Sequence, residues 1–264
     1  MERSRLKAIM IVILALVNIF LLASLAQERL SVLSARRTAQ AQVVRLFEAD
    51  GITLDTSAIS RETPPSPVQL TRDEGLERSA AALLLDGGWT YSEQGGTHRY
   101  QLGGAAVQFR AGGSFSAAGL AGEDGAALCR RFCQSFSLRE PESIPESGSV
   151  SAGALYQNAA VFNASVTFTF ADGVLTEVSG TLLPQNGTSV SPDSELYSAL
   201  AALTAFQAVR RANQAVASVV EGMELCFSLQ SGAGDTMSLE PAWCIITDTV
   251  NYYVNCVTGT VTTA

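Results

Sequence analysis

The chain has 264 residues, 47% of them hydrophobic, and its 17 basic and 25 acidic residues give a net charge of −8. This composition excludes a disordered chain, and the acidic balance argues against nucleic-acid binding, which needs a basic stripe. The length allows an N-terminal anchor followed by two modest domains or one large one.

The N-terminus predicts a membrane anchor. A basic tail over 1–7 precedes an apolar run over 8–26, in which only Asn18 and Ser24 are polar. As a helix the run would rise about 28 Å at ~1.5 Å per residue, enough to cross a hydrocarbon core of roughly 30 Å. Basic flanks stay in the cytoplasm, so we expect a single-pass protein of the cell membrane with its body outside. A signal peptide cleaved after Ala26 is the alternative, although the run exceeds a usual apolar region of about 7–15 residues.

A juxtamembrane segment over 27–59 follows the predicted span. Its apolar residues recur along one stripe and predict a helix over 27–49, which Gly51 ends. The next residues, "ITLD", predict a short strand.

The third region, 60–145, predicts a first extracytoplasmic α+β unit. It opens on a proline-rich linker over 60–70 and continues as a helix over 71–88, with Thr71 as N-cap and Glu74 as its capping-box partner. Strands separated by glycine pairs are then expected, before a second helix and a second linker. The expected strands are 89–94, 98–102, 105–110 and 114–120, the helix is 123–136, and the linker is 138–153.

The last region, 146–264, predicts a second unit of the same kind. Two or three strands lie within 154–184, with Asp172-Gly173 as a hairpin turn. A helix over 191–214 follows, with Ser191 as N-cap and Pro192 in the first turn. The closing strands are expected near 223–230, 238–247, 250–256 and 259–263. The fold class is therefore α+β: an N-terminal transmembrane helix followed by two tandem units, each a helix on an antiparallel sheet.

The C-terminal stretch, "LEPAWCIITDTVNYYVNCVTGTV", has the most aromatic strand pattern of the chain. Alternation places Trp243 and Cys244 on opposite faces. We expect Trp243 and Tyr253 to pack on the helix through Leu200, Leu203 and Phe206. Asn255 is expected to bond across the turn, and Gly259 to supply a positive φ. The residues assigned a structural role are Pro241, Trp243, Tyr253, Asn255 and Gly259.

The cysteines and the single histidine offer little chemistry. An odd number of cysteines with irregular spacing favours buried free thiols, with a disulfide among the last three as the alternative. His98 stands alone at a strand start, which is typical of a surface or edge residue, and a catalytic triad would rest on it alone. No G-x-S-x-G or H-E-x-x-H motif occurs. We predict no enzyme and no catalytic, cofactor or metal site, and an enzyme of another type is the least favoured reading. The cysteines are Cys129, Cys133, Cys226, Cys244 and Cys256.

Two segments carry a family resemblance. "RLKAIMIVILALVNIFLL", with Asn-x-Phe-Leu-Leu at 18–22, and "LEPAWCIIT…YYVNCVTGTV" resemble the ends of the YycI regulators, membrane-anchored accessory proteins of the WalK/WalR cell-wall two-component system of Gram-positive bacteria. The C-terminal hairpin is also similar to that of PepSY-type domains.

The resemblance implies a non-enzymatic regulator that contacts a sensor histidine kinase through its span and its exported body. The partners it implies are the membrane, the kinase and a YycH-like protein, without nucleic acid. Asn18 and Phe20 are the predicted contact residues of the span, because an Asn in hydrocarbon seeks a hydrogen-bond partner on another helix. The alternative is a PepSY-like inhibitor or chaperone of an exported enzyme such as a peptidase.

Overall fold

The computed structural model describes residues 17–18, 20–21, 27, 34–121, 124–213, 217–232 and 235–263. It divides into two compact units, Met1–Thr56 and Ser57–Ala264. Most of the predicted span over 8–26 lies outside the described residues. Within the described part of the chain, no helix combines the length and the hydrophobicity that a membrane crossing requires.

The first unit contains a helix over 34–49 and the short strand β1 (Thr53–Leu54). The helix ends where the sequence predicts, because Gly51 adopts a positive φ of 72° and donates its N–H to the carbonyl of Glu48. Ile52 then donates to the carbonyl of Phe47, which turns the chain out of the helix.

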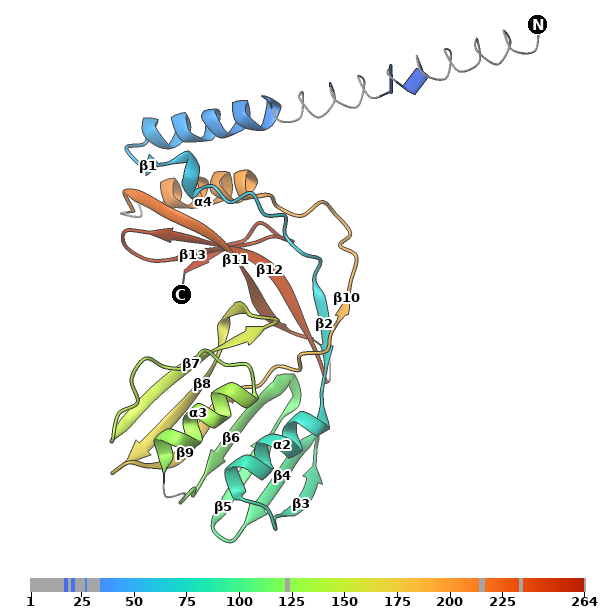
Figure 1. The fold of residues 1–264 in the computed structure, drawn as a ribbon, viewed down its shortest axis with the longest axis vertical. Helices are drawn as coiled ribbons and strands as arrows, with labels where there is room; N and C mark the ends of the chain where they lie inside the picture. Colours follow the sequence, from blue (N-terminus) through green and yellow to red (C-terminus); the bar gives the residue numbers. More distant parts are fainter. Residues whose placement is uncertain are drawn as a thin grey trace, which may run out of the picture. The chain divides into compact units, whose positions relative to one another are not determined.

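The second unit is an α+β structure, as predicted, and its sheet is mixed and mostly antiparallel (Figure 1). Its helices are α2 (Glu74–Leu85), α3 (Gly125–Ser135) and α4 (Ala199–Asn213), with 3₁₀ turns η1 (Thr56–Ala58) and η2 (Ala111–Gly113). Its strands are β2 (Val68–Thr71), β3 (Thr90–Gln94), β4 (Thr97–Leu102), β5 (Ala105–Phe109), β6 (Ser114–Ala118), β7 (Gly148–Tyr156), β8 (Ala159–Ala171), β9 (Val174–Thr181), β10 (Thr188–Ser189), β11 (Val219–Ser231), β12 (Thr236–Thr247), β13 (Tyr252–Asn255) and β14 (Val261–Thr263).

The strands of this unit form a continuous sheet. Its main order is β10-β2-β12-β11-β8-β9-β6-β5-β4-β3, with β13 beside β12, β14 beside β13 and β7 beside β8. Within residues 57–264, β11 and β8 make the one described parallel pairing, where Phe227 lies opposite Val161. The sheet crosses the expected boundary at residue 145, because β6 pairs with β9 and β2 pairs with β12.

The core lies between this sheet and its helices. Helices α2 and α3 cover one face of the strands from β3 to β9, and α4 lies against β12, β13 and β14 (Figure 1). A row of aromatic rings joins the strands to α3, with neighbouring ring centroids 5.5–5.9 Å apart. The rings are those of Tyr100, Phe109, Phe115, Phe132 and Phe168.

Two helices begin later than predicted. Helix α2 is capped by Asp73, whose Oδ1 accepts the N–H groups of Gly75 and Leu76 at 2.8 and 3.1 Å. The prediction of Thr71 as N-cap is wrong because Thr71 belongs to β2, opposite Thr236.

Helix α4 begins at Ala199, not near residue 191, and Ser198 caps it. The cause is Tyr197, whose N–H donates to the carbonyl of Cys256 and whose carbonyl accepts the Trp243 indole N–H. The backbone N–H and the carbonyl of Tyr197 therefore both form hydrogen bonds with the C-terminal hairpin, and the helix begins only after this residue.

Both predicted linkers contain strand. Strand β2 begins at Val68, inside the segment read as linker 60–70, because Leu70 is buried against β12. Strand β7 begins at Gly148, inside the segment read as linker 138–153. Its small and serine-rich residues hide the alternation that Ala152, Ala154 and Tyr156 show by their burial.

Candidate functional site

The single histidine is a core residue, and the prediction of a surface or edge position is wrong. His98 is 5% exposed, and its Nδ1 lies 2.7 Å from Oε2 of Glu77. Alternation along β4 turns His98 inward together with Tyr100. Glu77 lies on the buried side of α2 and supplies the partner that a buried imidazole needs.

Arg72 completes this buried ionic network. Its Nε lies 2.6 Å from Oε1 of Glu77, and its Nη2 lies 3.3 Å from Oε2. The guanidinium also donates to the carbonyls of Gly96 at 2.6 Å and Phe109 at 3.3 Å. Burial alone would lower the pKa of Arg72, but the hydrogen bonds and charges of Glu77 and Asp235 together outweigh it and raise that pKa.

The Arg72–Glu77–His98 network is built for stability. The cavity beside it, lined in part by Arg72, Glu77 and Met237, has a volume of about 10 Å³. Such a space is at the limit for one water molecule and excludes a substrate. The network therefore ties α2 to β4 and to the ends of β3 and β5.

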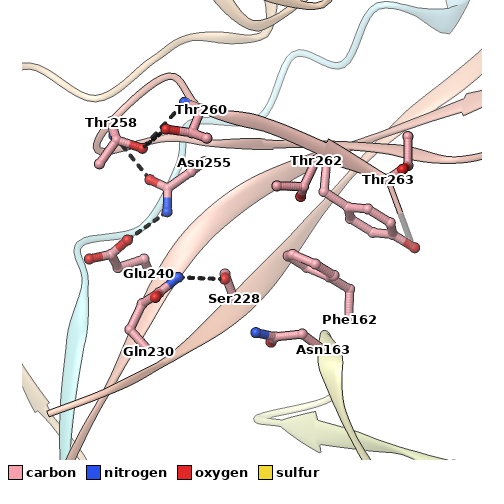
Figure 2. Close-up of a pocket in the computed structure, with 11 residues that line it drawn as sticks. Phe162, Asn163, Ser228, Gln230, Glu240, Asn255, Thr258, Thr260, Thr262 and Thr263 are labelled. Atoms are coloured by element: carbon pink, nitrogen blue, oxygen red, sulfur yellow. Dashed lines mark hydrogen bonds between the residues drawn. The ribbon is translucent and has the colours of Figure 1, made fainter.

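A larger hollow lies on the face of the C-terminal sheet opposite α4. We call it the hairpin groove. Its volume is about 630 Å³ (Figure 2). It is lined by Phe162, Asn163, Ser228, Gln230, Glu240, Tyr253, Asn255, Thr258, Thr260, Thr262 and Thr263. Most of these side chains carry a hydroxyl or an amide, so the polar groups of the groove are nearly all uncharged.

Two stacked aromatic rings border the hairpin groove. The rings of Phe162 and Tyr253 have centroids 4.0 Å apart and planes 14° apart. A second hollow of about 440 Å³ shares both rings and continues past Cys226 and Cys244. Burial raises the pKa of Tyr253, so its phenol stays protonated at neutral pH.

Hydrogen bonds fix several groove side chains. The Asn163 amide donates to the carbonyl of Leu229 at 2.8 Å and accepts its N–H at 2.7 Å. Gln230 donates its Nε2 to Oγ of Ser228 at 2.9 Å. Figure 2 shows these amides turned toward the same hollow from β8 and β11.

Glu240 is the one charged residue among those that line the groove, and Nδ2 of Asn255 donates to its Oε2 at 2.5 Å. The Asn255 Oδ1 accepts the N–H groups of Val257 and Thr258, at 2.8 and 3.0 Å. This Asx turn fixes the loop that carries the groove threonines.

Gly259 lets the loop close on the segment before α4. Its φ is 71°, and a Cβ on it would lie 2.5 Å from the ring of Tyr197. A larger residue would meet both a strained backbone and an occupied space.

Pro241 sits in the interior of β12, where a missing N–H would ordinarily break a ladder. Strand β12 pairs with β2 up to Leu239 and with β13 from Ala242 onward. Pro241 falls between these partners, and its carbonyl accepts the N–H of Cys256 at 2.8 Å. Because the N and O of one strand residue point to the same side, the missing donor faces this gap and leaves the β11 ladder intact.

The other face of β12 packs on α4. Trp243 is 0% exposed and donates its Nε1–H to the carbonyl of Tyr197 at 2.9 Å. Tyr252 meets Phe206 of α4, with ring centroids 4.7 Å apart. The prediction that Tyr253 packs on the helix is wrong, because Tyr253 lies opposite Cys244 and points to the hairpin groove.

All five cysteines are free and buried. Burial raises the pKa of Cys256 to about 12 and raises the pKa of Cys244. Among the residues that the structure describes, no group of three or more His, Cys, Asp or Glu side chains could hold a metal ion.

The predicted contact residues of the span, Asn18 and Phe20, are helical and exposed, and Phe20 is 71% exposed. Of the other residues of the predicted span, Val17 and Leu21 are described and are also exposed, and the rest lie outside the described part of the chain.

Sequence reasoning missed most of the hairpin groove. Its residues come from β8, β11, β12 and the C-terminal hairpin, which lie far apart in the sequence. The available signal was a polar residue at alternate positions of a buried strand, as in Ser228 and Gln230.

Comparisons with known proteins show a likeness in structure. No family model matches the chain, and no curated protein matches it in sequence. An uncharacterized protein from Eubacterium rectale ATCC 33656 is similar with a TM-score of 0.43 and 7% identity, over 75% of this chain and 85% of that one. The Bacillus megaterium YpeB C-terminal domain is similar with a TM-score of 0.34 and 12% identity, over 74% of this chain and 98% of that one.

Proposed function

We propose that the chain is a non-enzymatic regulator anchored in the cell membrane, whose exported body recognises a ligand and whose anchor contacts a sensor histidine kinase. The hairpin groove carries this proposal. Its volume of about 630 Å³ falls in the range of ligand sites. Its side chains are held by hydrogen bonds that orient them for binding, and among the residues that line it no histidine or lysine stands beside a nucleophile.

The resemblance of both chain ends to the YycI regulators supports the kinase as partner and a YycH-like protein as a second partner. It also supports a cytoplasmic N-terminus and an exported body. We further propose that 60–145 and 146–264 are two PepSY-like units that share one sheet. Each contains a helix against antiparallel strands, and their sheets join where β6 pairs with β9.

Crosslinking followed by affinity purification tests the proposed partner. The full chain, expressed in its host and crosslinked in intact membranes, should retain a sensor histidine kinase. Asn18→Leu should weaken that recovery, because it removes the polar group of the predicted span. Val17→Leu is the matched control, since it alters a neighbouring residue without removing a polar group.

The outcomes separate the two candidate functions. Recovery of the kinase that falls with Asn18→Leu and not with Val17→Leu supports the regulator. Recovery of an exported peptidase in place of the kinase supports the PepSY-like inhibitor or chaperone. Equal kinase recovery by all three proteins would show that Asn18 is not a contact residue.

A further inference from the structure

We infer that the hairpin groove binds a neutral, polyhydroxylated ligand, an oligosaccharide. This inference deepens the proposed function and rests on it, because it names the ligand that the exported body recognises. It depends on the chemistry of the lining side chains, on the aromatic border and on the position of the groove on the sheet.

The polar lining matches hydroxyl groups. Serine and threonine hydroxyls donate and accept, and Asn and Gln amides offer both kinds of group. A sugar hydroxyl also donates and accepts, so it can satisfy such a surface in either direction. The groove presents these groups from four strands and one loop, in place of a single charged anchor.

The charges disfavour an ionic ligand. No Arg, Lys or His lines the groove, so an anion finds no counter-charge there. A cation finds only Glu240, and one oxygen of this carboxylate already accepts from Asn255. Binding an ion would then require removing it from water without a matching charge, which is costly.

The aromatic border suits the apolar side of a sugar ring. Phe162 and Tyr253 are partly exposed and stack on each other, so they form one rigid apolar wall. Ligand sites combine such walls with a few placed polar groups, which fix orientation. A pyranose ring has this division: C–H groups on its faces and hydroxyls at its rim.

The position of the groove disfavours an extended peptide. Peptides added to a sheet pair with backbone groups at an edge. Here the lining side chains stand on the face of the sheet, at alternate positions such as Ser228 and Gln230. The backbone groups of β11, β12 and β13 are paired along the ladders, so these strands offer the groove side chains without an open backbone edge. Strand β14, which among the described strands pairs with β13 alone, is the open edge beside the groove, and the peptide in the test below probes it.

Two groove residues are free to bind the ligand. Gln230 is exposed and spends only its Nε2 on Ser228. Thr262 is exposed, and the described residues give its hydroxyl no hydrogen-bond partner. Asn163 and Asn255 serve mainly to hold the groove in shape, since they bond to backbone groups.

The test uses the full chain in a detergent without a sugar headgroup. It is applied to an array of neutral glucan, mannan, galactan and chitin oligosaccharides, with acidic oligosaccharides and an uncharged ten-residue peptide of alternating Thr and Val beside them. The best neutral ligand is then titrated by calorimetry. The variant Gln230→Ala/Thr262→Val should weaken its Kd at least tenfold, which corresponds to about 1.4 kcal/mol.

The matched control is Gln94→Ala/Thr90→Val, which makes the same two changes on the exposed strand β3. Binding of a neutral oligosaccharide that the groove variant loses and the control keeps supports the inference. Three results overturn it: no neutral oligosaccharide bound, equal loss in both variants, or groove-dependent binding of the peptide alone. Kinase recovery is measured separately. A failure to bind oligosaccharides therefore does not contradict the regulator proposal, and a failure to recover the kinase does not contradict oligosaccharide binding.

Discussion

Removing the charge of Glu77 should strongly destabilise the second unit. Glu77 is 5% exposed and holds both Arg72 and His98. Glu77→Gln keeps the shape and leaves the buried guanidinium with one weak counter-charge, the carboxylate of Asp235, which lies 3.5 Å from Nη1 and is 61% exposed. Breaking a buried ion pair in this way typically costs about 3–5 kcal/mol. We expect the lower end, about 3 kcal/mol, because the carbonyls of Gly96 and Phe109 still accept from Arg72.

The assay is thermal unfolding of the purified full chain, followed by circular dichroism at neutral pH. For a unit of this size each kcal/mol lowers Tm by about 2–4 °C, so Glu77→Gln should lower it by about 6–12 °C. Glu93→Gln is the control. Its carboxylate lies 4.0 Å from His98 Nε2, but the side chain is 58% exposed, and such pairs contribute about 0–1 kcal/mol.

A double substitution tests the mechanism. Arg72→Met/Glu77→Gln also removes the buried guanidinium and should recover part of the lost stability, since an apolar replacement avoids the desolvation cost. Two results would refute the reasoning. One is a decrease in Tm smaller than about 2 °C for Glu77→Gln. The other is a double variant that loses more stability than the two single variants lose in total.

Other expected results concern the C-terminal hairpin and its surroundings. Trp243→Ala should cost about 3–5 kcal/mol and lower the amount of folded protein in the cell. A normal Tm with lost partner binding would instead make the hairpin a contact surface. Gly259→Ala should lower Tm more than Gly103→Ala. Both glycines have a positive φ, but only at Gly259 would the added Cβ meet a tyrosine ring. Equal decreases in Tm would mean that backbone strain alone accounts for the loss. Alkylation of Cys256 in the native chain should stay slow from pH 7 to pH 9, since this thiol is buried with a pKa of about 12; rapid labelling of this residue would contradict its burial. The pKa of Asp248 is lowered by hydrogen bonds from Ser218 and Val219, so its contribution is present above the unfolded pKa of about 3.9 and is lost as pH falls through the folded value. Asp248→Asn should therefore make the stability of the protein depend less on pH in the acid range. An unchanged dependence on pH would contradict this role of Asp248.

The sequence predicts local elements well where turns carry distinct residues. The strands β3 to β6 are recognised because glycine pairs separate them, and Asp172-Gly173 marks the β8–β9 turn with φ values of 52° and 78°. The alternation that places Trp243 and Cys244 on opposite faces follows from the two-residue repeat of a strand.

Tertiary contacts decide the features that the sequence does not reveal. The start of α4 depends on backbone bonds between Tyr197 and the distant hairpin. The burial of His98 depends on a glutamate 21 residues earlier. The hairpin groove likewise depends on the one parallel contact described between β8 and β11, for which no local pattern exists.

The packing of strand β12 on both faces restricts insertions and deletions in this part of the gene. Its residues alternate between the hairpin groove and a buried side, where Leu239 joins the core and Trp243 lies against the α4 region, and both of its long edges are paired. Loss of a single codon between 236 and 240 would turn each later residue of the strand to the opposite face, moving Trp243 toward the groove and a groove-side residue toward α4. The same loss would shift Pro241 from the gap between β2 and β13 onto a paired position. We therefore expect related genes to vary in the lengths of the loops around β12, and to keep the length of the strand itself.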